Sequence, residues 1–216
     1  MNTKDRAEKI ILILKKNYVN VPNLFLNHNT PAQMLCAIIL SAQSTDAQVN
    51  IVTKELFKKY KKVTDFANAK QNEFEKEIFS TGFYKNKAKN IINCFKKIEK
   101  EHGGKIPWNM QDLIALDGVG RKTANLVLLS HGDVRGVAVD THVLRLANRF
   151  GVTKTKNANK VELDLIKLYD KKYWGLVNKM YISHGRATCT AKKPQCQECF
   201  IRNEKLCPRI GVINSK

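Results

Sequence analysis

Four cysteines near the C-terminus have the residue type and spacing of a metal centre. They are Cys189, Cys196, Cys199 and Cys207, separated by six, two and seven residues. Thiolates are soft ligands, and four of them in one short stretch suit a [4Fe–4S] cluster, with structural zinc as the alternative. Basic residues surround them, including Lys192 and Lys193. The sequence therefore predicts a basic loop braced by a metal, able to bind phosphate groups of DNA.

A pair of glycines forms a second motif with chemical meaning. Gly118 and Gly120 flank Val119, and Arg121 follows at the start of a helical pattern. Glycines here permit a tight turn and a close approach of the backbone to another molecule. The backbone N–H groups of such a turn, and of the helix N-terminus after it, bind phosphate oxygens without reading base sequence. We predict that residues 118–121 contact DNA.

Lys122 follows directly in the first turn of that predicted helix. A cation is disfavoured at this end of the helix dipole, and nearby basic groups act in the same direction, so both favour the neutral, nucleophilic amine. A lysine amine can attack a sugar carbon, form a Schiff base and permit elimination at the neighbouring carbon. The alternative is a solvated surface lysine.

Asp140 stands between the apolar residues 137–139 and a helical pattern that begins at Val143. The position is typical of a helix N-cap. A capping carboxylate is held ionised by helix N–H groups, so it can also present negative charge to an active site, where it stabilises a sugar cation or moves a proton. For His142 we favour a capping or packing role over acid–base chemistry.

The elements that position these residues are predicted to be helices. Apolar residues recur with helical spacing along most of the chain, and sustained alternation of period two is scarce. Proline, glycine and asparagine divide the pattern into short segments. The predicted fold class is all-α, with helices over residues 110–116 and 121–130 on either side of the glycine turn.

Composition and charge indicate a folded protein that binds a polyanion. The formal net charge is +19, and 43% of the residues are hydrophobic, so the chain can bury a core. Nucleic acid is the partner that this charge favours, with an anionic membrane surface or simple solubility as alternatives.

The same sequence argues against a membrane span and a disulfide framework. The longest apolar run, residues 34–40, is far shorter than the roughly 20 residues that cross a bilayer, and we predict a buried helix there. The first residues lack the pattern of a secretory signal, so we expect a cytoplasmic protein. Cys36 and Cys94 lie alone in apolar helical patterns and are predicted to be core residues.

Together these motifs resemble the bacterial endonuclease III family of helix-hairpin-helix DNA glycosylases, over nearly the whole chain. The matching stretches are LDGVGRKTA at 116–124, VDTH at 139–142, LSAQSTD at 40–46, YKNKA at 84–88, and HGR at 184–186 before the cysteines. The resemblance implies a six-helix barrel domain over residues 24–134, with the helix-hairpin-helix at about 110–130. It also implies an iron-sulfur cluster domain made of residues 1–23 and 135–216, with the cluster loop at 189–207 and the active-site cleft between the domains.

The resemblance also implies roles for single residues. Lys122 matches the Schiff-base lysine, Asp140 the catalytic aspartate, and the four cysteines the [4Fe–4S] ligands. Gln43 matches the side chain that fills the gap when a damaged nucleotide is turned out of the stack. Gly118 and Gly120 match the turn that contacts phosphate.

Two positions depart from the family pattern. Seven residues separate Cys199 from Cys207, where the family usually has five; a longer surface loop costs little closure entropy, so a cluster is still expected, with zinc or a labile cluster as alternatives. Phe83 stands where the family often has leucine. An aromatic ring there either stacks on an orphaned base and contacts DNA, or packs in the core.

The predicted function is that of a base-excision repair enzyme. It would remove oxidised pyrimidines from double-stranded DNA and cleave the strand 3′ to the abasic site by β-elimination. One alternative is a monofunctional or mismatch-directed glycosylase, and another is a non-enzymatic, metal-containing DNA-binding module. We expect a monomer, associated with the bacterial nucleoid when bound to DNA.

Overall fold

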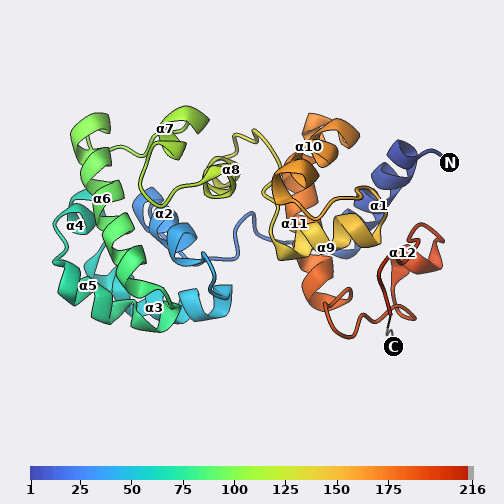
Figure 1. The fold of residues 1–216 in the computed structure, drawn as a ribbon, viewed down its shortest axis with the longest axis horizontal. Coiled ribbons are helices and arrows are strands. Elements are labelled where there is room, and N and C mark those ends of the chain that lie inside the picture. The colour runs from blue at the N-terminus through green and yellow to red at the C-terminus, as the bar shows by residue number, and fades with distance from the viewer. Residues whose placement is uncertain (214–216) are drawn as a thin grey trace. The chain divides into compact units, whose positions relative to one another are not determined.

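The structure, a computed structural model, describes residues 1–213, and all regular secondary structure within them is helical (Figure 1). The prediction of an all-α fold is confirmed. The helices are α1 (Thr3–Asn17), α2 (Pro31–Leu40), α3 (Asp46–Lys59), α4 (Val63–Ala67), α5 (Gln71–Glu77), the 3₁₀ helix η1 (Phe79–Thr81), α6 (Tyr84–His102), α7 (Met110–Ile114), α8 (Arg121–Ser130), α9 (Thr141–Arg149), α10 (Ala158–Leu168), α11 (Lys171–Ala187) and α12 (Phe200–Asn203). None of the described helices is both long and apolar enough for a membrane crossing.

The chain forms two compact units, each with its own apolar core. One is the continuous segment Leu24–Asp133, and the other combines Met1–Asn23 with Val134–Lys216. Because the second unit contains both ends of the sequence, its helices α1 and α11 come from opposite ends of the chain and pack together.

The continuous unit is built around α2 and α6 (Figure 1). Residues 32–40 of α2 are all buried, which confirms the prediction of a buried helix in the longest apolar run. Helix α6 packs against α4 and α5, while α2 packs against α3 and α8. Cys36 and Cys94 are fully buried in this core, as predicted. The glycine turn that leads into α8 therefore sits on a rigid framework.

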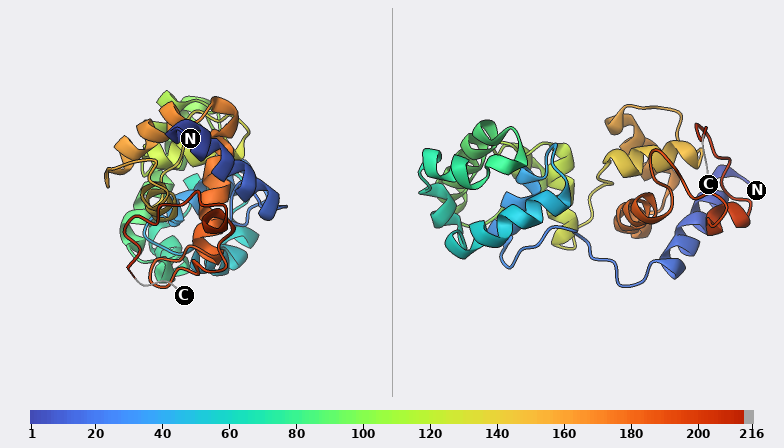
Figure 2. Two further views of the ribbon diagram at one scale, coloured as in Figure 1. Left: turned by 90° about the vertical axis from the view of Figure 1, so that its right-hand side faces the viewer. Right: turned by 90° about the horizontal axis from the view of Figure 1, so that it is seen from below.

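The discontinuous unit packs α11 against α9 and α1. In Figure 2 the N-terminal helix α1, drawn in blue, lies beside the C-terminal helix α12, drawn in red. Arg6 of α1 fixes this arrangement, because its guanidinium donates hydrogen bonds to the carbonyls of Phe150, Gly151 and Leu206. The N-terminal helix thus ties the end of α9 to the residue that precedes the last cysteine.

The helix before the glycine turn is shorter than predicted. It ends at Ile114 because the next residues form tighter bonds, from Ala115 N–H to Asp112 O (3.2 Å) and from Leu116 N–H to Leu113 O (3.1 Å). Such i to i−3 bonds commonly close the last turn of a helix. Helix α8 begins at Arg121 and ends at Ser130, as predicted.

Candidate active site and metal centre

The glycine turn has the tight geometry that the sequence predicts. Gly118 has a φ of +74°, and a Cβ atom at this position would lie 3.0 Å from Cβ of Asn90 in α6. The turn therefore packs against α6 at a distance that only glycine allows. The Val119 side chain is buried and its N–H donates to Leu116 O (3.2 Å), so Val119 anchors the turn.

Replacing Gly118 with alanine should destabilise this turn. The positive φ costs a side-chain-bearing residue roughly 1–2 kcal/mol, and the new methyl group would press on Asn90. We expect a lower melting temperature and weaker binding to undamaged duplex DNA. Gly120→Ala is the matched control for stability, because Gly120 has a φ of −85° and open space around its missing Cβ. Equal stability losses in the two variants would refute the steric argument.

Lys122 lies in the first turn of α8 and is exposed to solvent. Arg121 precedes it and is exposed as well, and the first turn contains no acidic side chain. Ala124 N–H bonds to Gly120 O at 2.9 Å, so the helix is regular from its start. The amine of Lys122 thus projects from a fixed helical position directly after the glycine turn.

Asp140 is the N-cap of α9 and is half-buried. Its Oδ1 accepts a hydrogen bond from Val143 N–H at 2.8 Å, which confirms the predicted cap. The preceding segment is held by Asn178 of α11, whose buried side chain accepts from Ala138 N–H (2.9 Å) and donates to Ala138 O (2.5 Å). Asn178 therefore positions the backbone that leads to the Asp140 carboxylate.

His142 is placed by packing and by Arg145. Its Nδ1 accepts a hydrogen bond from the Arg145 guanidinium (3.0 Å), and a Cβ added at Gly185 would lie 2.9 Å from the same atom. Burial lowers the pKa of His142, with Arg145 and Arg186 contributing in the same direction and Asp140 opposing them. The ring is therefore neutral at pH 7 and packs where α9 meets Gly185, in agreement with the packing role predicted for it.

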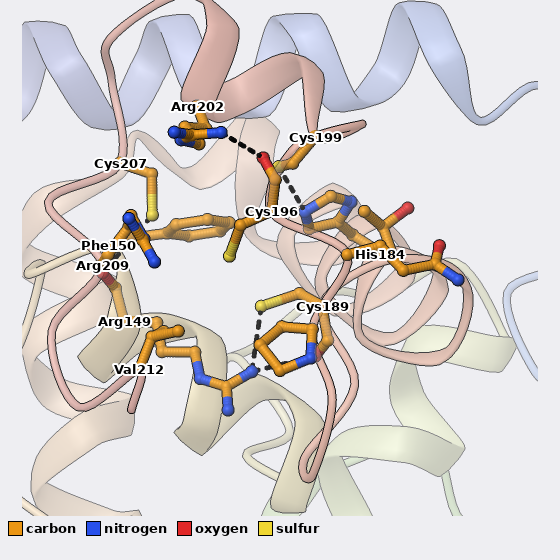
Figure 3. Close-up of a pocket in the computed structure, with 13 residues that line it drawn as sticks. Arg149, Phe150, His184, Cys189, Cys196, Cys199, Arg202, Cys207, Arg209 and Val212 are labelled. Atoms are coloured by element: carbon orange, nitrogen blue, oxygen red, sulfur yellow. Dashed lines mark hydrogen bonds between the residues drawn. The ribbon is translucent and has the colours of Figure 1, made fainter. Parts of the chain in front are cut away.

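The four cysteines line one cavity in the discontinuous unit (Figure 3). Cys189, Cys196 and Cys199 are buried and Cys207 is half-buried. Four thiols around a shared space fit a [4Fe–4S] cluster, in which each cysteine binds a different iron. Burial raises the pKa of the Cys207 thiol to about 11, so cluster assembly has to displace its proton.

The longer spacing before the last cysteine does not remove Cys207 from this cavity. The seven residues between Cys199 and Cys207 comprise the short helix α12 and a turn closed by the bond from Leu206 N–H to Ile201 O (3.1 Å). Ile201 and Leu206 are both buried. The loop is therefore longer but well packed, and Cys207 still faces the other three cysteines.

Arg149 and His184 are cavity residues that sequence reasoning missed. The buried guanidinium of Arg149 donates to Cys189 Sγ (3.2 Å), Thr190 O (2.7 Å) and Ala191 O (3.0 Å). His184 Nε2 lies 3.5 Å from Cys199 Sγ, and burial lowers the pKa of His184 to about 4. The only sequence signals were a basic residue in the last turn of α9 and the HGR stretch before the cysteines.

Replacing Arg149 with methionine should loosen the start of the cysteine loop. A fully buried carbonyl left without a donor costs about 1–3 kcal/mol, which is an upper bound for the part-buried carbonyls of Thr190 and Ala191. Cys189 Sγ also loses its hydrogen bond. We expect less iron per protein after purification and a lower melting temperature. Arg202→Met is the matched control, because Arg202 is exposed and, within the described residues, its guanidinium has one hydrogen bond to the loop, at Cys196 O (3.3 Å). Native iron content in the Arg149 variant would contradict this role.

Gln43 and Phe83 lie on two exposed turns of the continuous unit. Both have the left-handed backbone that is uncommon for residues other than glycine, with φ values of 55° and 49°. The side chain of Phe83 is 64% exposed, which excludes the packed-core alternative. Lys192 and Lys193 are exposed on the cysteine loop of the other unit, where Thr190 Oγ1 donates to Lys193 O (2.8 Å).

Comparison with known proteins defines the class. Residues 36–171 match the HhH-GPD superfamily of base excision DNA repair proteins. Residues 189–204 match the iron-sulfur binding domain of endonuclease III, so three of the four cysteines lie inside the match and Cys207 follows it. The first match contains the glycine turn, Lys122 and Asp140. The second match contains most of the cysteine loop.

Curated relatives and solved structures narrow the class to one family. The chain is 47% identical to endonuclease III of Synechocystis sp. over 95% of its length and 93% of that protein. It is 42% identical to endonuclease III of Bacillus subtilis over 81% and 80% of the two chains. The structure of a trapped endonuclease III–DNA covalent intermediate superimposes with a TM-score of 0.89, at 37% identity over 97% of both chains. The chain therefore belongs to the endonuclease III family.

This membership confirms several predictions. The chain is a base-excision DNA glycosylase with abasic-site lyase activity, and the alternative of a non-enzymatic binding module is not favoured. The cofactor is a [4Fe–4S] cluster rather than zinc. The roles of individual residues remain predictions, as do the predicted domain boundaries and the cleft between the domains.

Proposed function

We propose that Lys122 is the nucleophile and Asp140 the assisting carboxylate of a reaction on oxidised pyrimidines in duplex DNA. The observation that carries this proposal is the position of Lys122. Its exposed amine follows directly on a tight glycine turn of the kind that binds phosphate. A DNA backbone held by that turn would bring a sugar close to the amine.

The chemistry uses one amine for two steps. Nζ of Lys122 attacks C1′ of the damaged nucleotide, and the glycosidic bond breaks with its electron pair going to the base, which takes up a proton. The amine loses its proton, and opening of the sugar ring gives a protonated Schiff base. Loss of a proton from C2′ then expels the 3′ phosphate by β-elimination. Water hydrolyses the Schiff base and frees Lys122.

Asp140 assists these reaction steps through its negative charge. Its carboxylate is fixed by the hydrogen bond from Val143 N–H at the N-terminus of α9, where the helix dipole is positive. A carboxylate beside the sugar stabilises the positive charge that develops as the base departs. It can also carry the proton that leaves the attacking amine.

The exposed turns and loops supply the DNA contacts. Gln43 fills the gap left by the extruded nucleotide, and Phe83 stacks on the base that has lost its partner. Gly118, Gly120 and Arg121 bind the DNA backbone near the lesion. Lys192 and Lys193 bind phosphates from the cysteine loop. DNA complexes of structural neighbours at 37% identity support this partner, and we propose that the chain acts as a monomer in the bacterial cytoplasm, on nucleoid DNA.

Binding to undamaged DNA should depend steeply on salt. The net charge of +19 favours binding through phosphates, and each neutralised phosphate releases counterions. If six or more phosphates are contacted, affinity should fall about 10³-fold between 50 and 200 mM salt. Fluorescence anisotropy with a labelled duplex measures this dependence. An affinity that does not change with salt would contradict binding through phosphates.

A nicking assay tests the proposed function. The substrate is a labelled duplex with one oxidised pyrimidine, analysed with and without alkaline treatment. A strand cut without alkali supports a glycosylase that is also a lyase. A cut that appears only after alkali would mean a monofunctional glycosylase, and an intact strand in both samples would contradict excision of this lesion.

A further inference from the structure

A buried lysine connects the two turns that carry Gln43 and Phe83. Lys87 lies in α6 and is only 5% exposed. Its Nζ donates to Leu40 O (2.8 Å), Ser44 Oγ (2.9 Å) and Thr81 O (2.8 Å). A protonated lysine has three N–H donors, so these three bonds use all of them.

The three acceptors belong to segments that are distant in sequence. Leu40 ends α2, and its carbonyl is among those that a helix leaves without an internal partner. Ser44 follows Gln43 in the turn after α2. Thr81 ends η1, two residues before Phe83. Lys87 therefore joins the base of the Gln43 turn to the base of the Phe83 turn.

Two further contacts strengthen this junction. Ser44 Oγ donates to Thr81 O, so the two turns are also bonded directly. Gln48 at the start of α3 donates from Nε2 to Ser80 Oγ (2.8 Å). The bonded atoms lie at the bases of the two turns, whereas the side chains of Gln43 and Phe83 at the tips are exposed.

The backbone at both tips requires such support. Left-handed φ values at residues other than glycine cost free energy and persist only where the surrounding structure enforces them. Each tip lies within two residues of an atom that Lys87 binds. Burial lowers the pKa of Lys87 to about 8, so at pH 7 most molecules still carry the ammonium with its three donors. The carbonyl end of α2 favours that charge.

We propose that Lys87 is a positioning residue that locks the Gln43 turn and the Phe83 turn into one unit, so that both side chains enter duplex DNA together. The inference rests on the proposed function, which assigns the two side chains to the gap and to the orphaned base. Lys87 assists opening of the duplex by holding the two turns in place, and it takes no part in the chemistry at Lys122.

The test compares a substrate that must be opened with one that is already open. Lys87→Met keeps the length of the side chain and removes the donors. On duplex DNA with an oxidised pyrimidine, its single-turnover excision should slow by about tenfold, within the range of couplings in one hydrogen-bond network. On a single-stranded oligonucleotide with an abasic site, borohydride trapping should match the native protein. Lys96→Met removes an exposed lysine from the same helix and should change neither result.

Each outcome bears on the proposal. An equal loss on both substrates would overturn it, because Lys87 would then support the site as a whole. Native rates on both substrates would also overturn it. Absence of an adduct with the native protein on abasic duplex DNA as well as on the single strand would instead reject the proposed function. If Lys87→Met does not fold, Ser44→Ala carries the same test, since it removes one acceptor and should slow only the duplex reaction.

A double-mutant cycle provides the second readout. If the turns act as one unit, the losses caused by Gln43→Ala and Phe83→Ala should be non-additive in the native background. In the Lys87→Met background the same two losses should become additive. Additive losses in both backgrounds would show that the turns act independently, and would refute the proposal.

Discussion

Lys122→Ala should abolish covalent trapping on abasic DNA and reduce base release from an oxidised pyrimidine by about 10³-fold or more, because removing the nucleophile from a covalent mechanism costs factors of that order or larger. The measurement is borohydride reduction on duplex DNA with one abasic site, followed by gel electrophoresis. Borohydride reduces the Schiff base to a stable amine, so a shifted band reports the bond between lysine and sugar.

The structure makes the control for this variant clear. Lys122 is exposed in the first turn of α8, so its truncation should leave the melting temperature and the cluster absorbance unchanged. Lys96→Ala removes an equivalent charge from α6 and should trap as well as the native protein. An adduct that survives Lys122→Ala would assign the chemistry to another amine.

The sequence predicted local features well because local chemistry determines them. The start of α8 follows from the two glycines, and the Asp140 cap follows from an acid placed directly before a helical pattern. The buried helix α2 follows from an apolar run too long for a surface segment. Each of these features depends on residues within about one or two helical turns of one another.

Buried polar groups could not be predicted in this way. Lys87, Asn178 and Arg149 each bind atoms that lie 40 to 47 residues away in the sequence. Periodicity places such residues on a helix but gives no information on the loop that the helix will meet. The left-handed turns at Gln43 and Phe83 could not be predicted for a related reason. Neither residue is a glycine, and the hydrogen bonds that enforce their backbone conformation are non-local.

For the last cysteine, spacing alone did not determine which metal centre the four cysteines bind. Two additional residues before Cys207 left zinc or a labile cluster open as alternatives. In the structure the seven residues between Cys199 and Cys207 include α12, whose residue Ile201 is buried against the rest of the unit. Burial of apolar side chains thus compensates for the longer loop, and the family comparison supports the [4Fe–4S] cluster.

Asp140→Asn should separate the two roles that the carboxylate holds. Asparagine caps helices about as well as aspartate, so the bond to Val143 N–H should persist and the melting temperature should stay close to native. The negative charge is lost, and base release should slow by about 10²- to 10⁴-fold, the range for loss of a positioned acid–base group. Single-turnover excision and thermal unfolding measured on one preparation give both quantities.

Two further variants complete this argument. Asp140→Ala removes the cap as well as the charge, so it should slow excision as much as Asp140→Asn and also lose about 1 kcal/mol of stability. Asp170→Asn is the matched control, because Asp170 is the N-cap residue of α11 in the same unit and its side chain makes no capping bond; it should excise at the native rate. If Asp140→Asn also excised at the native rate, Asp140 would be a helix cap alone, and the charge opposite the developing sugar cation would have to come from another residue.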